Sequence, residues 1–183
     1  LTTEEVTAFA ESVFAFVDEL AAESVAGYAE SQAAAASEQE RLRGLLLEAL
    51  TGPAQDSAVI RRAAIAVGWP IPDHLRAIST RGGELRSIAR GFGSDALTAP
   101  GDGDELVILW PDPRGPGRDA RLLSAVSRIS EPVAIGPAVP LALAARSLRG
   151  ARTTLGLGIR GVLGDGPWRW EDHLTSIGLA QAE

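Results

Sequence analysis

Three acidic side chains lie close together in a glycine-containing turn near the middle of the sequence. The stretch reads Gly101-Asp102-Gly103-Asp104-Glu105. Its glycines supply the positive φ angles of a tight turn, and clustered carboxylates are the groups that hold hard cations in phosphoryl chemistry. The run at residues 105–110 is rich in β-formers without polar alternation, which is typical of a strand buried on both faces. We therefore expect a β-hairpin here, and its turn is the first candidate site.

Three arginines recur at every third residue of one expected helix: Arg146, Arg149 and Arg152. Guanidinium groups bind oxyanions with two parallel hydrogen bonds, so this row is a candidate contact for an unknown anionic small-molecule effector. The competing interpretation is a row of charges that faces solvent, which is the common role of a charged stripe on an amphipathic helix.

Two other patterns carry less weight. His74 and His173 each neighbour an aspartate, but without a third ligand or a nucleophile they make a weak metal or acid–base site. Residues 156–161 match G-x-G-x-x-G, yet the dinucleotide motif follows a strand and opens a helix, whereas this one trails a helix. We interpret it as a loop, and we assign no catalytic residue, cofactor or metal ligand.

Residues 1–52 are expected to form a helical segment. Apolar residues recur at helical spacing from Val6 to Leu20 and again from Leu42 to Leu50, with an interruption at Gly27 and Tyr28. Two amphipathic helices must cover their apolar faces by packing on each other as a hairpin, on the following domain, or on a second copy. We favour a homodimer, and the intramolecular hairpin is the alternative.

Residues 53–183 are expected to form an α+β domain. A short helix at 57–67, ended by Gly68, precedes five strands and three more helices. The strands are expected at 75–80, 96–99, 105–110, 132–136 and 168–170, and the helices at 84–90, 118–129 and 141–155. This order predicts a ferredoxin-like βαββαβ unit with helices on one face of a largely antiparallel sheet. Nucleotide-cyclase palm domains share the layout, but so do unrelated domains.

The composition excludes several classes of protein. There are 24 acidic and 17 basic residues, for a net charge of −7, so the chain lacks the positive surface of a nucleic-acid binder. It has no cysteine, which excludes disulfides and zinc fingers and permits a bacterial cytoplasmic location. No apolar run approaches the roughly 20 residues that cross a bilayer, so no membrane contact is expected. Because the chain begins at Leu1 and lacks methionine, we expect it to be part of a longer protein.

Several stretches, in order, resemble the middle region of PucR-type (also called CdaR-type) bacterial transcription regulators, in which a GGDEF-like domain precedes a C-terminal helix-turn-helix. The matching stretches are residues 17–20, 27–30, 41–52, 66–72, 135–140, 144–152 and 171–174. The hairpin is similar to the GGDEF motif of diguanylate cyclases, with Gly103-Asp104-Glu105-Leu106 in place of Gly-Asp-Glu-Phe.

Two departures from the cyclase pattern matter. Asp102 interrupts the glycine pair, so a phosphate would meet a carboxylate there. The metal-binding acid that the resemblance implies falls near Ser79-Thr80-Arg81, where no acid stands. We therefore predict a module that is not an enzyme and that dimerises and relays a signal to a DNA-binding helix-turn-helix outside this segment. The alternative is a GGDEF-like domain that binds or processes a GTP-type nucleotide.

Overall fold

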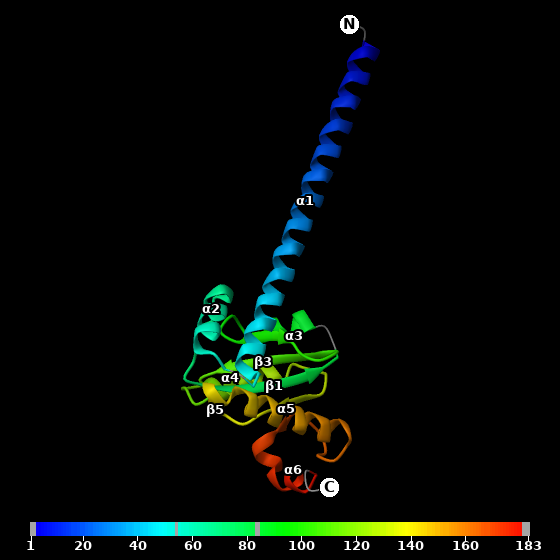
Figure 1. Ribbon diagram of the computed structural model, residues 1–183. Coiled ribbons are helices and arrows are strands. Elements are labelled where there is room, and N and C mark those ends of the chain that lie inside the picture. Colours follow the sequence, from blue (N-terminus) through cyan, green and yellow to red (C-terminus); the bar gives the residue numbers. More distant parts are fainter. Residues whose placement is uncertain (1–2, 54, 83–84, 181–183) are drawn as a thin grey trace. The chain divides into compact units, whose positions relative to one another are not determined.

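The computed structural model describes residues 3–53, 55–82 and 85–180 (Figure 1). The chain divides into two compact units, Leu1–Gln39 and Glu40–Glu183. The described part of the first unit is a single α-helix, α1, whose full extent is Thr3–Thr51. None of the described helices combines the length and the apolar character that a bilayer span requires.

Helix α1 runs without a break, so the predicted interruption at Gly27 and Tyr28 is wrong. A glycine inside a helix costs about 1 kcal/mol relative to alanine, and the alanine-rich sequence on both sides of Gly27 offsets that cost. A continuous helix cannot fold back on itself, so the hairpin of two helices is not formed. All side chains from residue 16 to 38 are exposed. The helix ends at Thr51, immediately before Gly52, as predicted.

The second unit is built on a sheet with the strand order β2-β3-β1-β4-β6, and a short strand β5 also pairs with β1. All pairings are antiparallel except that of β4 with β6, which is parallel. Both β1 and β3 lie in the interior of the sheet (Figure 1), and every residue of β3 is buried, as its apolar sequence predicted. The strands are β1 His74–Arg81, β2 Leu97–Pro100, β3 Glu105–Pro111, β4 Val133–Ile135, β5 Val139–Pro140 and β6 Trp168–Arg169.

Helices cover both faces of the sheet, so the prediction that they share one face is wrong. Successive residues of β1 show this, because Ala77 belongs to one apolar core and Ile78 to the other. A strand that is apolar on both faces needs cover on both. Helices α3 Leu85–Gly91 and α4 Arg118–Val126 supply one layer of the βαββαβ unit. The other layer holds α2 Ser57–Val67, α5 Ala144–Ile159 and the last turns of α1, with Leu46 and Leu50 fully buried.

The capping of α2 follows the sequence closely. The Asp56 side chain accepts hydrogen bonds from the backbone N–H groups of Ala58 and Val59, and Gly68 ends the helix in the left-handed conformation with φ 66°.

Helix α4 stops at Val126, three residues before the predicted end. After β6 the described residues form a 3-10 turn, Trp170–His173, and helix α6, Leu174–Ala180.

Helix α5 continues to Ile159, so the interpretation of residues 156–161 as a loop is wrong for the first four of them. Gly158, one of the glycines of this motif, has a role in packing. A Cβ atom there would lie 2.4 Å from atoms of the Trp168 ring, so the missing side chain lets β6 pack on α5. The motif still does not open a helix after a strand, as dinucleotide binding would require.

Candidate functional site

The acidic turn forms the predicted hairpin between β2 and β3. The backbone N–H of Gly101 donates to the carbonyl of Glu105 at 2.9 Å, and the N–H of Glu105 donates to the carbonyl of Asp102 at 3.2 Å. Gly103 takes the positive φ of 66° that the turn requires. The hairpin therefore places Glu105 at the first position of the interior strand β3.

The carboxylate of Glu105 is enclosed by groups from three elements. Its side chain is 1% exposed. The Ser79 hydroxyl of β1 donates to Oε1 at 2.5 Å, and Nε and Nη2 of Arg152 on α5 donate at 3.0 and 2.6 Å. A Cβ atom on Gly101 would lie 2.2 Å from Oε2, so this glycine is required by the position of the carboxylate itself.

The charges of this pair stabilise each other. Burial alone would raise the pKa of Glu105, but hydrogen bonds from Arg152 and Ser79 and the positive charge of Arg152 outweigh it, so the net pKa lies below its usual range. The hydrogen bond to Glu105 likewise raises the pKa of Arg152 against the effect of its burial. Glu105 is therefore held as a carboxylate whose main partner is a guanidinium group.

The other two acids of the turn do not join Glu105 in a ligand cluster. Asp102 is largely exposed and lies 3.2 Å from Nη2 of Arg152, while Asp104 is exposed. Among the residues that the structure describes, no group of three or more histidine or acidic side chains is arranged to hold a metal ion. His74 and His173 are both half-buried, at the start of β1 and at the end of the 3-10 turn.

The end of β1 supplies a hydroxyl pair and a cation where the cyclase resemblance implies an acid. Ser79 donates to Glu105, Thr80 donates to the carbonyl of Pro132 at 2.8 Å, and Arg81 is exposed opposite Glu105 in the strand register. The cavity between this strand end and α5 has a volume of about 130 Å³. Pockets for small ligands usually measure about 300–1,000 Å³, so a nucleotide does not fit here without rearrangement.

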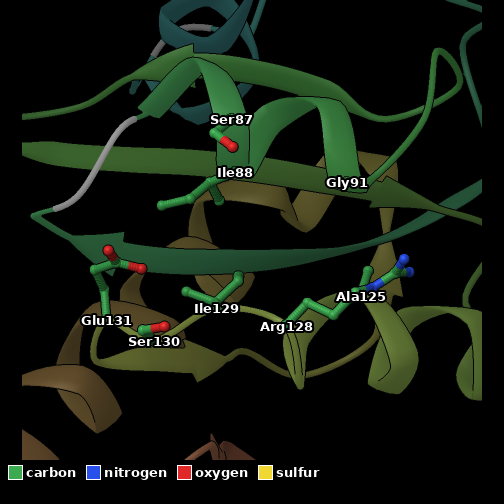
Figure 2. A pocket seen from close by; sticks show the side chains of 8 residues that line it. All are labelled: Ser87, Ile88, Gly91, Ala125, Arg128, Ile129, Ser130 and Glu131. Carbon is green, nitrogen blue, oxygen red and sulfur yellow. The ribbon is translucent and has the colours of Figure 1, made fainter.

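A second hollow lies between α3 and the segment that follows α4 (Figure 2). Its volume is about 390 Å³. Its charged lining residues are Arg128 and Glu131. Figure 2 shows them apart, with Ile129 and Ser130 between them. Nε of Arg128 already donates to the carbonyl of Ser124 at 2.9 Å. This hollow therefore offers no convergent set of polar groups.

The structure does not bring the predicted arginine row together. Arg152 pairs with Glu105, Arg149 is exposed, and Arg146 lines a separate cavity with Arg76 and Arg114. Arg76, which is 7% exposed within β1, was not among the predicted site residues. An arginine among the apolar residues Leu75, Ala77 and Ile78 was the available signal, because arginine is almost never fully buried unless it is paired.

A sheet built on a βαββαβ unit, with helices on both faces and an acidic hairpin between β2 and β3, defines an α+β domain of the GGDEF-like class. The chain belongs to the PucR-type regulators that carry this domain: the PucR-like N-terminal domain family matches residues 1–51 and the GGDEF-like domain family matches residues 51–157. The family indicates a regulatory role.

A solved structure supports the fold. The crystal structure of a regulator of polyketide synthase expression from Bifidobacterium adolescentis superposes with a TM-score of 0.57 at 18% sequence identity. The match covers 76% of this chain and 58% of that chain, so this chain spans little more than half of its structural relative. No curated protein matches the sequence.

Proposed function

We propose that this chain is a non-catalytic regulatory and dimerisation module of a PucR-type transcription regulator, and that it relays a signal to a DNA-binding domain outside the segment. The observation that carries the proposal is the pairing of Glu105 with Arg152. An acid that is buried, charged and bonded to a guanidinium and a hydroxyl is not available as a metal ligand. Two-metal phosphoryl transfer needs several free carboxylates at one place.

Dimerisation through α1 is supported by its exposed apolar side chains. Phe16, Val17, Leu20 and Tyr28 are all exposed and fall within about 120° of one another around the helix at 100° per residue. The opposite side of the helix is mostly alanine and acidic residues. A second copy of the same helix is a partner that can cover this stripe, as in parallel or antiparallel helical dimers.

Light scattering or sedimentation at micromolar concentration tests the dimer. We expect a dimer for the native chain and a monomer for Leu20→Glu, because the added carboxylate lies within the stripe. Ala22→Glu is the matched control, since it adds the same charge to the same helix about 200° away. A native chain that is monomeric across this range, or equal effects of both variants, would refute dimerisation through this face.

Signal relay has a physical route along α1. Leu46 and Leu50 near its end are fully buried in the core of the sheet domain, whereas the stripe at Phe16 to Tyr28 is exposed. A change in how two copies of α1 pack would therefore change the strain on that core, and two packings separated by a few kcal/mol suffice for a switch. In a Leu20→Cys variant, a disulfide can cross-link two copies. This cross-link should alter the hydrogen-exchange rate of the Leu50 backbone amide. Unchanged exchange would argue against this route.

The alternative function, binding or processing of a GTP-type nucleotide, has a direct test. A ligand at 100 times its Kd stabilises the folded state by about 2.7 kcal/mol, which a melting experiment detects readily. We expect GTP with magnesium to leave the melting temperature unchanged and no nucleotide product to form. A shift that is lost in Asp104→Ala would establish the alternative instead.

A further inference from the structure

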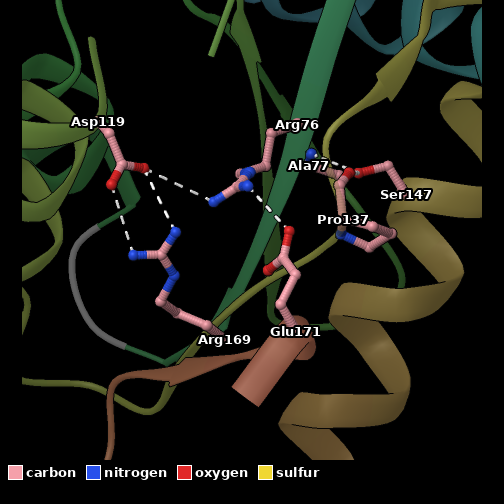
Figure 3. Close-up of polar contacts among 7 residues, drawn as sticks. All are labelled: Arg76, Ala77, Asp119, Pro137, Ser147, Arg169 and Glu171. Carbon is pink, nitrogen blue, oxygen red and sulfur yellow. Dashed lines mark hydrogen bonds and ion pairs between the residues drawn. The ribbon is translucent and has the colours of Figure 1, made fainter. Parts of the chain in front are cut away.

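The buried guanidinium of Arg76 stands at the centre of a charged cluster that the proposed function does not use (Figure 3). Its Nη2 donates to Oε1 of Glu171 at 2.8 Å, and its Nη1 lies 3.7 Å from Oδ1 of Asp119. Arg169 lies 3.4 Å from the same oxygen of Asp119. Two carboxylates thus face two guanidinium groups from β1 and β6.

The hydrogen bonding of Arg76 is incomplete. The residue is only 7% exposed, so water does not readily reach it. Its Nε and Nη1 atoms are buried and have no hydrogen-bond partner within the described part of the chain. An unsatisfied buried donor costs about 1–3 kcal/mol, and more when it is charged. Burial lowers the pKa of Arg76, against the charges of Glu171 and Asp119 and with help from Arg169 and Arg114. Arg76 therefore has charge partners but lacks part of its hydrogen bonding.

Arg76 lines a cavity of about 450 Å³, which is the size of a small-ligand pocket. Arg114 from the loop after β3 and Arg146 from α5 line the same cavity. Both are exposed, and neither forms an ion pair with any residue that the structure describes. The remaining wall contains one acid, Glu171, which is paired with Arg76, and is otherwise apolar or aromatic, with Pro137, Leu143 and Trp170 among its residues.

We propose that this cavity binds a small organic anion, in which a carboxylate or phosphate group contacts Arg76, Arg114 and Arg146 and an apolar body packs near Trp170. The lining carries three guanidinium groups against one carboxylate, that of Glu171, so the cavity has an excess of positive charge that water alone would not offset. An oxyanion would offset it, because each guanidinium offers a fork of N–H groups that matches its geometry. Binding at this cavity is independent of dimerisation and of the hairpin.

The wall of the cavity is tied to the centre of the sheet. The Ser147 hydroxyl donates to the carbonyl of Pro137 at 2.6 Å and accepts from the backbone N–H of Ala77 at 2.8 Å (Figure 3). This places Pro137, which lines the cavity, one hydrogen-bonded side chain away from the residue next to Arg76. The pocket is therefore held by buried contacts on this side and not by a surface loop alone.

Binding can be measured by NMR on the 15N-labelled chain, because its four tryptophans give separate indole signals. Benzoate and phenyl phosphate serve as probes that share an apolar body and differ in the anionic group, and benzamide is the neutral control. We expect a saturable shift of the Trp170 indole with one or both anions and none with benzamide. The Trp170 signal is identified by its absence in Trp170→Phe.

Matched variants locate the site. Arg114→Ala combined with Arg146→Ala should weaken binding about tenfold or more, since a charge-assisted hydrogen bond contributes more than 1.4 kcal/mol, which is tenfold in Kd. Arg149→Ala, an exposed arginine of the same helix outside the cavity, should leave Kd unchanged. Arg76 is kept, because its removal would leave Glu171 unpaired. No saturable shift with either anion, an equal shift with benzamide, or equal weakening by Arg149→Ala would overturn the proposal.

Discussion

Replacing Arg152 by methionine should convert Glu105 from a stabilising to a destabilising group at neutral pH. Methionine keeps most of the aliphatic stem, so the change tests the charge more than the packing. Breaking a buried ion pair by removing one partner costs about 3–5 kcal/mol. The Arg152 side chain is 39% exposed, and Ser79 and the Asp102 N–H still donate to the carboxylate. We therefore expect a loss of about 2–3 kcal/mol in the free energy of unfolding at pH 7.

The pH dependence supplies a more specific test. In the native chain the pKa of Glu105 is lowered, so its contribution is present above the unfolded pKa of about 4.3 and is lost as the pH falls through the folded value. Without Arg152, burial dominates and the folded pKa rises above the unfolded one. The folded variant then binds more protons than the unfolded chain, so its deficit relative to the native chain should shrink as the pH falls from 7 to 5.

Urea unfolding of the native chain, Arg152→Met and Arg149→Met at several pH values measures both effects. For a chain of this length, 2–3 kcal/mol corresponds to a melting shift of about 4–12 °C. Arg149→Met, on the same helix and exposed, should change stability by less than about 0.5 kcal/mol. Adding Glu105→Gln to Arg152→Met should restore stability at pH 7, because it removes the unpaired buried charge. A loss below about 0.5 kcal/mol, or a deficit that grows in acid, would refute this account of the hairpin.

Three further predictions concern stability and are checked by the same unfolding measurements. Ser147→Ala should cost about 1–3 kcal/mol, because it leaves a buried backbone N–H of β1 without its acceptor; a neutral result would mean that water replaces the hydroxyl. Gly158→Ala should cost about 1–3 kcal/mol by forcing the Trp168 ring away, whereas Gly156→Ala, with open space around it in the same helix, should gain about 0.5–1 kcal/mol. Equal effects at the two glycines would contradict this packing. Asp102→Ala should change stability by less than about 1 kcal/mol, since its ion pair with Arg152 is exposed, and a larger loss would show that the pair is stronger than its geometry indicates.

Local features were predictable from the sequence because their causes are local. The hairpin at Gly101 to Glu105 follows from turn chemistry next to an apolar strand, and helix α2 follows from Asp56 and Gly68 at its two ends. The predicted interruption of α1 at Gly27 is wrong because the helix formers on both sides outweigh the cost of one glycine.

The contacts that define the candidate sites were not predictable in this way. Glu105 and Arg152 are 47 residues apart, and Arg76 and Glu171 are 95 apart. Nothing in the periodicity of α5 distinguishes Arg152, which pairs inward, from Arg149, which faces outward, because both fall on the same row of the helix. Only the packing of α5 against β1 and β4 decides which arginine meets the buried acid.

This packing also gives a reason other than catalysis for an acid at a cyclase-like hairpin. A carboxylate buried to the extent of Glu105 must be balanced by a positive charge, and a bound cation and a guanidinium can both supply it. Here Arg152 supplies it from within the chain, so the folded state needs no metal to keep Glu105 ionised. The acid is then retained by the stability of the fold, and its presence carries no information about catalysis. Arg146, six residues earlier on the same helix, pairs with no described acid, and the proposed anion would bind in the cavity that it lines together with Arg76 and Arg114.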